Sequence, residues 1–240
     1  LPIGVLIIQS FNAGKSRAKW EGFSFRWYGE LIKDRAIMEA LYVTLSVAII
    51  AAIVATVLGT LAAIGIFAMK KRPQAVMMTL TNIPMTMPDI VIGISLMLLF
   101  LFAKVERSYL TMLFAHITFN TPYVILSVMP KIKSMNKFSY EAALDLGASP
   151  FYALNHVIIP MIKQGIITGF LLAFTLSLDD FVVSYFTSSP LVKNLSTLIY
   201  SKTRIGIEPT LNALSAIMFI TILVLMLLIN KRNSKNETNY

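Results

Sequence analysis

The sequence contains no cysteine and few charged residues, and both shortages restrict the class of protein. Without cysteine the chain forms no disulfide and offers no thiolate to a metal. Charged residues are only 14 % of the 240 residues, whereas a soluble domain carries about 25 %. Hydrophobic residues make up 56 %, and the mean hydropathy is +0.72. This composition excludes an ordinary water-soluble enzyme and a disordered chain, and it predicts several membrane-spanning segments.

The charge that is present is unbalanced. Lysine and arginine number 21 against 12 acidic residues, which gives a net charge of +9. In a soluble protein this excess would suggest a nucleic-acid partner. Here the basic residues cluster in short gaps between apolar runs, as they do in the loops of membrane proteins. We therefore expect the lipid bilayer as a partner, and no nucleic acid.

Apolar runs separated by polar gaps predict five complete membrane-spanning helices. Their expected ranges are 40–69, 84–103, 109–130, 157–186 and 209–230, with a short interfacial piece before residue 84. Residues 1–11 are apolar but too few to cross a bilayer, which takes about 20 residues, so we interpret them as the end of a truncated first span. Because backbone in lipid must satisfy its own hydrogen bonds, the expected fold class is an all-α membrane protein, a polytopic bundle of about six helices.

The polar stretches predict how the rest of the chain is organised. Residues 1–230 are expected to form one transmembrane domain, with 131–160 and 187–208 as loops and 231–240 as a polar tail. Three basic clusters fall on one side of this topology, at 70–72, 131–137 and 231–235. The lysine and arginine bias is slight, because the opposite loops are also basic. We expect the first side, with the tail, to be cytoplasmic, mainly because of the motif described below.

One short motif is misleading. Gly14-Lys15-Ser16 looks like the end of a phosphate-binding loop, but the position that requires the earlier glycine holds Gln9. We therefore expect no nucleotide to bind this chain. The sequence also has neither a serine elbow nor an H-E-x-x-H pattern, so we expect no catalytic residue and no metal site.

The segment between the third and fourth complete spans carries the most information. Residues 140–146 favour a helix, with Ser139 available as its N-cap, and Gly147 is expected to end it. Pro150 suits the first turn of a second short helix, and Pro160 marks the start of the next span. The pattern predicts a helix–turn–helix outside the bilayer.

This segment resembles the EAA loop of the permease subunits of ABC importers. The resemblance rests on the spacing of an E-A-A triplet, a glycine and a terminal hydrophobic-x-hydrophobic-proline group, which here are Glu141, Ala142, Ala143, Gly147 and Val157-x-Ile159-Pro160. It implies the type I ABC importer permease fold. It also implies that the loop is cytoplasmic and docks on a separate ATP-binding subunit, so that Glu141 and the two small alanines meet that partner.

Three further segments resemble permeases of spermidine and putrescine importers, at 87–95, 174–184 and 199–213. The resemblance implies ATP-driven polyamine import by alternating access across a bacterial cell membrane. Its implied partners are a second, similar permease, a dimer of ATP-binding subunits and an external substrate-binding protein. ATP and magnesium would be held by the ATP-binding subunits, and this chain would carry no cofactor and no catalysis.

Asp89 is the first candidate for the substrate path. It follows Pro88 in an apolar segment that also contains Pro84. An ionised carboxylate in a membrane segment is costly, so it should face a cavity or a partner, and a broken helix with an acid suits a cation path. The alternative is that Asp89 caps a helix that begins there.

Asp179 and Asp180 are the second candidates. Two neighbouring carboxylates suit a diamine or polyamine, and Phe181 or Tyr185 can add a cation–π contact. Adjacent helical positions differ by about 100°, so we expect only one of the two acids to face the cavity. The alternative is that the span ends there and both acids are solvated.

Two pairs of residues spaced by four are expected to join helices. His116 and Asn120 lie on one face of a span, where an interhelical hydrogen bond is the favoured interpretation. Gly165 and Gly169 form a G-x-x-x-G pattern that allows close helix packing.

Two other functions remain open at this point. One is the same type of importer with a different small solute. The other is an ion-coupled secondary transporter that uses Asp89 or Asp179 and needs no ATP-binding partner.

Overall fold

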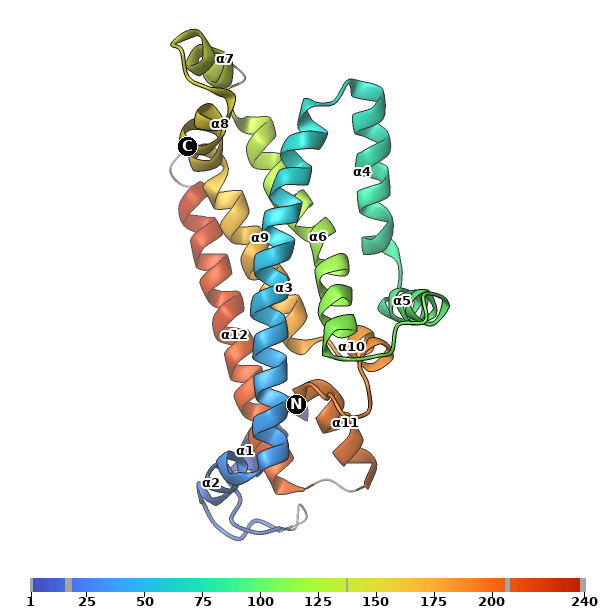
Figure 1. Ribbon diagram of the computed structural model, residues 1–240. Helices are drawn as coiled ribbons and strands as arrows, with labels where there is room; N and C mark the ends of the chain where they lie inside the picture. Colours follow the sequence, from blue (N-terminus) through green and yellow to red (C-terminus); the bar gives the residue numbers. More distant parts are fainter. Residues whose placement is uncertain (1, 16–18, 137, 206–207, 238–240) are drawn as a thin grey trace.

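The computed structural model shows an all-helical chain whose long helices run side by side (Figure 1). It describes residues 2–15, 19–136, 138–205 and 208–237. The helices in the first half are α1 Pro2–Ser10, α2 Arg26–Lys33, α3 Arg35–Ala68, α4 Lys71–Thr86, α5 Asp89–Phe102 and α6 Tyr109–Ser134. Those in the second half are α7 Phe138–Asp145, α8 Pro150–Ala153, a π-helical turn Leu154–Ile158, α9 Ile159–Asp179, α10 Val182–Thr187, α11 Leu195–Ile205 and α12 Pro209–Glu237.

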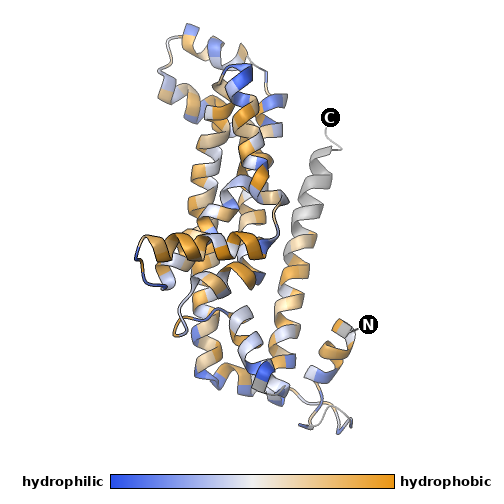
Figure 2. Cartoon of the chain, turned by 90° about the vertical axis from the view of Figure 1, so that its right-hand side faces the viewer, coloured by the Kyte–Doolittle hydropathy of each residue, from blue (hydrophilic) through white to orange (hydrophobic). Residues whose placement is uncertain are grey.

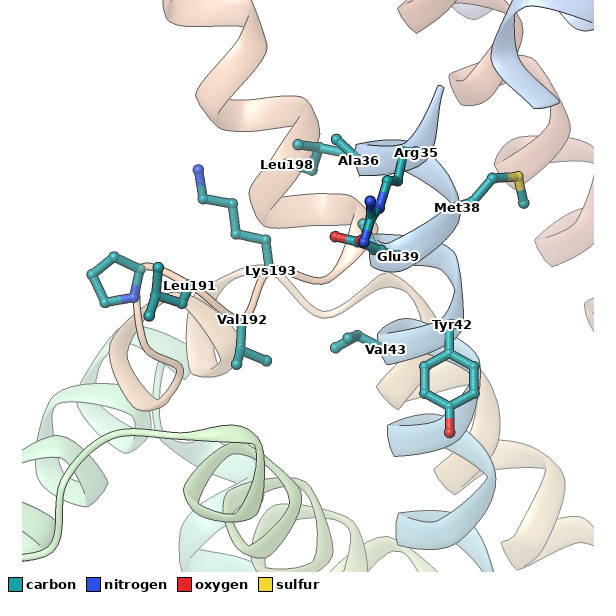
Figure 3. Close-up of a pocket in the computed structure, with 12 residues that line it drawn as sticks. Arg35, Ala36, Met38, Glu39, Tyr42, Val43, Leu191, Val192, Lys193 and Leu198 are labelled. Carbon is teal, nitrogen blue, oxygen red and sulfur yellow. The ribbon is translucent and has the colours of Figure 1, made fainter. Parts of the chain in front are cut away.

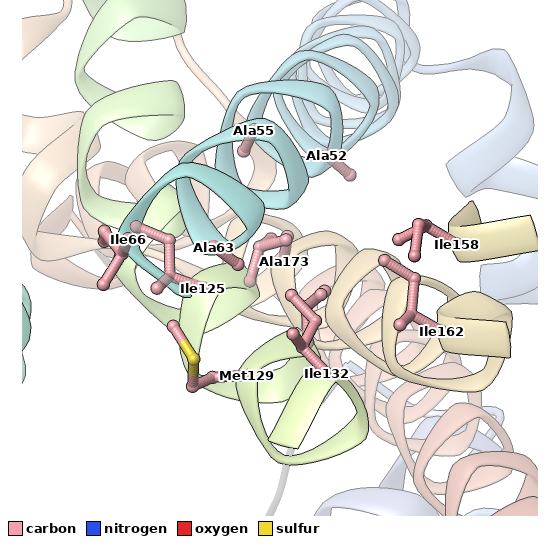
Figure 4. Close-up of a cluster of buried hydrophobic side chains, with 12 residues drawn as sticks. Ala52, Ala55, Ala63, Ile66, Ile125, Met129, Ile132, Ile158, Ile162 and Ala173 are labelled. Carbon is pink, nitrogen blue, oxygen red and sulfur yellow. The ribbon is translucent and has the colours of Figure 1, made fainter. Parts of the chain in front are cut away.

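Helices α3, α6 and α9 form the centre of the bundle. Their shared core combines mostly alanines of α3 with larger side chains of α6 and of the stretch that leads into α9, and Ala173 is the buried alanine of α9 in it (Figure 4). Val124 of α6 lies between two glycines, because a Cβ on Gly59 of α3 would be 2.7 Å from Val124 Cβ and one on Gly169 of α9 would be 3.1 Å from Val124 Cγ1. Gly165 is equally close to α6, since its Cβ would lie 2.9 Å from the Ser127 carbonyl oxygen. The small residues therefore let three backbones approach closely.

Within the described part of the chain, three helical segments are long and apolar enough to cross a membrane, namely α3, α6 and the continuous stretch Pro150–Asp179. Helices α4 and α5 meet that criterion only as a pair, and the Pro209–Val224 part of α12 is apolar but shorter. Hydrophilic residues gather at the two ends of the bundle and hydrophobic ones between them (Figure 2). The predicted all-α membrane fold is thus confirmed.

The span expected at 84–103 is wrong at its start, because the helix that ends near Ala103 begins only at Asp89. Helix α4 continues through Pro84 to Thr86, and α5 leaves at an angle of 104° (Figure 1). The break lies at Met87 and Pro88, because the ring of a proline disfavours helical dihedrals in the residue before it. Pro84 is tolerated inside α4, which has no fully buried residue.

The apolar stretch at 157–186 is not one continuous span, and the alternative that the span ends at the two acids is confirmed in that respect. Helix α9 ends at Asp179, and α10 begins at Val182, which leaves Asp180 and Phe181 outside both helices. The predicted loop at 187–208 contains α11, whose first turn is capped by Asn194 Oδ1, the acceptor from the Thr197 N–H at 2.9 Å.

The two ends of the bundle differ. Helices α7 and α8 lie at the end where α3 turns into α4 and α6 finishes, whereas α2, α11 and the start of α3 lie at the other (Figure 1). The basic residues 70–72 and 131–133 therefore share the end that holds α7. Helix α12 continues beyond the expected limit at Asn230 as far as Glu237, so the predicted polar tail begins as helix. Ser16 and residues 238–240 lie outside the described part.

Candidate functional site

A cavity of about 370 Å³ lies where the two broken helices meet α6. Its wall is built from α4–α5, from α6 and from the end of α9 with the start of α10, and consists of Pro84, Asp89, Ile92, Phe119, Tyr123, Leu176, Asp179, Asp180, Phe181, Val182 and Val183. Three of these residues are acidic, and lysine and arginine do not occur among them. The structure therefore brings all three predicted acids to one negatively charged cavity.

Asp89 reaches this cavity because of the α4–α5 break. It is the first residue of α5, directly after Pro88, and it is exposed. A carboxylate in the first turn is favoured by the partial positive charge of a helix N-terminus. The N-cap residue of α5 is Pro88. The alternative that Asp89 caps this helix is therefore wrong for the N-cap position, although the Asp89 charge still favours the start of the helix.

Asp180 is committed to the fold of α10. Its Oδ2 accepts a hydrogen bond from the Ser184 N–H at 2.7 Å, and its Oδ1 accepts one from the Val183 N–H at 3.2 Å. His116 Nε2 lies 3.5 Å from Oδ2, and the Asp180 side chain is only 10 % exposed. These contacts make Asp180 an anchor of the first turn of α10.

Asp179 is different, because it is the exposed last residue of α9. Its backbone carbonyl accepts a 3.3 Å hydrogen bond from Ser196 Oγ. The expectation that only one of the two neighbouring acids would face the cavity assumed a continuous helix, and it is wrong because the helix ends between them. Both line the cavity, but Asp179 is the more accessible carboxylate.

The two aromatic residues predicted for the substrate path, Phe181 and Tyr185, line different cavities. Phe181 lines the acidic cavity, whereas Tyr185 lines a neighbouring cavity of about 430 Å³ that also contains Arg107 and Lys193. The rings of Phe181 and Tyr185 still touch, with centroids 5.5 Å apart.

Sequence reasoning missed two aromatic residues of the cavity wall, Phe119 and Tyr123. They lie four residues apart on α6, and Phe119 directly precedes Asn120. That spacing, next to a buried polar residue, was the signal available for finding them.

The polar side chains of α6 join helices as predicted. Asn120 Nδ2 donates to Ser177 Oγ of α9 at 2.6 Å. His116 Nε2 is hydrogen-bonded to Ser184 Oγ of α10 at 2.9 Å. The interhelical interpretation of both residues is confirmed. Among the described residues, no three histidine, aspartate or glutamate side chains are grouped closely enough to hold a metal ion.

The segment with the E-A-A pattern forms two short helices outside the bundle (Figure 1). Helix α7 starts at Phe138, whose N–H is accepted by Asn136 Oδ1 at 3.0 Å, so the predicted N-cap at Ser139 is wrong. Glu141 lies in the first turn. Gly147 ends the helix with φ +87°, and its N–H donates to the Leu144 carbonyl at 2.9 Å.

The second short helix starts where the sequence indicates. Ser149 Oγ accepts from the Tyr152 N–H, and Pro150 is the first residue of α8. Pro160 lies in the first turn of α9. Large apolar side chains project from this segment into the open, namely Phe138, Leu146, Phe151 and Tyr152, of which Leu146 is 90 % exposed. A depression of about 490 Å³ lies beside Leu146 and Gly147.

A larger pocket, of about 770 Å³, lies at the opposite end of the bundle (Figure 3). It is formed by the start of α3 and the segment before α11. Arg35 and Glu39 on its wall form an exposed ion pair at 2.7 Å, and Leu191 is 95 % exposed. The wall also holds Lys193, so its two basic residues outnumber its one acid and it lacks the negative character of the cavity at Asp179.

Comparison with known sequences places the chain in one family. Residues 55–232 match the family described as "Binding-protein-dependent transport system inner membrane component". The chain is 35 % identical to the spermidine/putrescine transport system permease protein PotC of Escherichia coli K12, over 99 % of this chain and 91 % of that protein. It is 39 % identical to the putrescine transport system permease protein PotI of the same strain, over 90 % of this chain and 80 % of PotI.

Solved structures show the same fold at low sequence identity. A bacterial ABC transporter involved in the import of the acidic polysaccharide alginate superposes with a TM-score of 0.68 and 15 % identity, covering 99 % of this chain and 88 % of that one. An amino acid ABC transporter with histidines gives a TM-score of 0.63 and 17 % identity, covering 87 % and 98 %. The expected ABC importer permease fold is confirmed, and the chain belongs to the family of inner-membrane components of binding-protein-dependent transport systems.

Proposed function

We propose that this chain is a permease subunit of an ATP-driven importer for polyamines such as spermidine and putrescine. The observation that carries the proposal is the cavity with three carboxylates and the rings of Phe119, Tyr123 and Phe181. Carboxylates and aromatic faces are the groups that bind alkylammonium cations. The names of PotC and PotI, which match this chain along most of its length, support the same cargo.

The cavity offers two separate carboxylates to a cargo with two or more ammonium groups. Asp89 is the first residue of α5, directly after the α4–α5 break, and Asp179 is the last residue of α9, directly before the α9–α10 break. A polyamine would bridge them, and a shift of α5 relative to α9 would change their separation. Alternating access would then alter the affinity of the cavity for the cargo. A ligand shifts a conformational equilibrium only if it binds the two states with different affinity, so such a difference for cargo or ATP is required.

The energy for this change would come from a partner. The exposed apolar side chains around Leu146 and the E-A-A turn of α7 suit docking on an ATP-binding subunit, which would hold ATP and magnesium. We place this end of the bundle, with the end of α12, in the cytoplasm, mainly because it carries the E-A-A segment that would dock on the ATP-binding subunit. No catalytic role falls to this chain.

Two further partners complete the proposed importer. A second, similar permease would form the other half of the path. An external substrate-binding protein would dock at the end that holds α2 and α11. The alginate transporter was also solved in complex with an alginate pentasaccharide-bound periplasmic protein, covering 87 % of this chain at a TM-score of 0.66, which supports a substrate-binding protein as a partner.

Uptake of labelled putrescine and spermidine tests the proposal in cells that lack their own polyamine carriers. Cells with the complete system should accumulate both amines, and Gly147→Asp should abolish uptake. Gly147→Asn is the matched control, because asparagine is similar in size to aspartate, adopts the positive φ of this turn and adds no charge. Amine uptake that is equal with and without this chain would refute the cargo. Uptake that persists without an ATP-binding subunit would instead indicate an ion-coupled transporter.

A further inference from the structure

The break between α9 and α10 is fixed by two side chains of α6 that lie one helical turn apart. Asn120 holds Ser177 on the α9 side of the break, at 2.6 Å. His116 holds Ser184 on the α10 side, at 2.9 Å. All four side chains are at most 1 % exposed. The two hydrogen bonds therefore bracket the unwound residues of the break from one rigid helix.

The segment before α11 adds a third fixed point. Asn194 Nδ2 donates to the Asp180 carbonyl oxygen at 3.0 Å and to Ser184 Oγ at 2.8 Å. Asn194 is 3 % exposed. A buried backbone carbonyl outside a helix is costly unless it finds a donor, and Asn194 supplies one. Ser184 Oγ is thus shared between α6 and the segment that leads into α11.

These contacts stabilise the interruption itself. A continuous helix would satisfy its backbone groups without help from side chains, and it would turn the residues after Asp179 by about 100° per position. Ties on both sides of the break oppose that rearrangement. They also keep Phe181 and Val182 on the wall of the cavity.

We propose that His116 and Asn120 are positioning residues of the cargo cavity. Acting through Ser184 and Ser177, they hold the α9–α10 break in the geometry that presents Asp179 to the cavity. They do not contact the cargo, since neither residue is part of the cavity wall. That the cavity binds an amine rests on the function proposed above, whereas the control of its geometry does not.

The absence of cysteine makes a direct test possible. A single Val182→Cys variant puts a thiol on the α10 wall, and Ile92→Cys puts one on the α5 wall. The complete importer is purified with each reporter, and the rate of modification by a small cationic methanethiosulfonate is measured. The rates are then compared after adding Ser184→Ala or Ser177→Ala, which remove only one hydroxyl each.

Each serine variant should change the rate at Val182→Cys by about tenfold, a factor that corresponds to losing one buried hydrogen bond. The rate at Ile92→Cys should change less than the rate at Val182→Cys, because α5 meets α10 through packing at Gly93 and Phe186 and not through these hydrogen bonds. Ser10→Ala is the matched control. Ser10 is 0 % exposed and hydrogen-bonds Tyr28 at 2.7 Å, within the α1–α2 region, and its loss should leave both rates unchanged.

An unchanged rate at Val182→Cys in both serine variants, with the complex fully assembled, would overturn the positioning role. If Ser184→Ala prevents assembly, Ser177→Ala decides the question alone, because it leaves the Asn194 contacts intact. Protection of Val182→Cys by putrescine is scored separately. If no polyamine protects it, the proposed cargo fails, while the comparison of rates still decides the positioning role.

Discussion

The two interruptions at the ends of α9 and α7 are stabilised in opposite ways. At Asp180 the chain is buried, and side chains from α6 and from the segment before α11 hold both sides of the break. At Gly147 the turn is exposed, and backbone hydrogen bonds within its own segment hold it, such as that from Ala148 N–H to the Ala143 carbonyl at 3.0 Å. Distant side chains therefore determine the geometry of the break at Asp180, whereas the local backbone determines the geometry of the turn at Gly147. The first suits the wall of a cavity, and the second suits a surface that a partner can grip.

The largest effect on stability is expected from a substitution of Asp180, which anchors the buried break. Asp180→Ala removes the acceptor of two N–H groups of α10 and the neighbour of His116. We expect a loss of about 3 kcal/mol of stability, because hydrogen bonds to a buried charged group are involved. Asp179→Ala, at an exposed position, should change stability by less than about 0.5 kcal/mol. Thermal unfolding in detergent measures both, and equal losses would contradict the assignment of Asp180 as the anchor.

Substitutions of Gly147 test whether the local backbone determines the exposed turn after α7. The Gly147 φ of +87° strains residues with a Cβ, β-branched ones most and asparagine least, although the space around it is open. Gly147→Val should therefore cost about 1–2 kcal/mol locally and distort the turn, whereas Gly147→Asn should be tolerated, since asparagine adopts this region more readily. The expected result is loss of putrescine uptake only with valine. The two variants should assemble equally, as judged by co-purification, and a similar uptake for both would show that the turn geometry does not matter.

The smallest effect is expected at the ion pair between α11 and the start of α3. Lys202 Nζ lies 2.8 Å from Asp34 Oδ2. Burial alone would raise the pKa of Asp34, but Lys202 and the N–H groups of Ile37 and Ala36 outweigh it, so the pKa falls below 3.8. Burial would likewise lower the pKa of Lys202, but Asp34 and Glu208 outweigh it, so the pKa rises above 10.5.

The pair should therefore stabilise the fold only between these limits. The contribution of Asp34 is lost as the pH falls below 3.8, and that of Lys202 is lost as the pH rises above 10.5. Lys202→Met should lower stability by up to about 1 kcal/mol from about pH 5 to about pH 9. Arg35→Met is the matched control, because Arg35 pairs with Glu39 at a fully open site. A pH-independent difference between Lys202→Met and the wild type would contradict the ion-pair account.

The sequence predicted those features that short-range chemistry decides. Gly147 and Pro150 mark the turn and the second helix of the α7–α8 segment because their backbone preferences act locally. His116 and Asn120 were recognisable as a polar pair on one helical face. The acids Asp89, Asp179 and Asp180 stood out because charge is rare in apolar runs.

The sequence did not predict features that depend on distant partners. The break at Asp180 depends on Ser184 and Asn194, and the fixed donors come from α6, more than 50 positions earlier in the chain. Helix α11 was hidden because its start depends on the Asn194 cap inside a polar segment. The α4–α5 break was expected at Pro84 but lies at Met87 and Pro88, because a proline inside a helical pattern does not by itself show whether the helix continues past it.

The central claim is that the exposed acid of the buried break, Asp179, binds the ammonium groups of the cargo. Its most direct test is putrescine uptake by complete importers that carry Asp179→Asn or Asp179→Glu at equal expression. The account predicts a loss of at least about tenfold with asparagine, which removes the charge at a similar size, and substantial uptake with glutamate. Uptake by the asparagine variant at the wild-type rate would contradict the account.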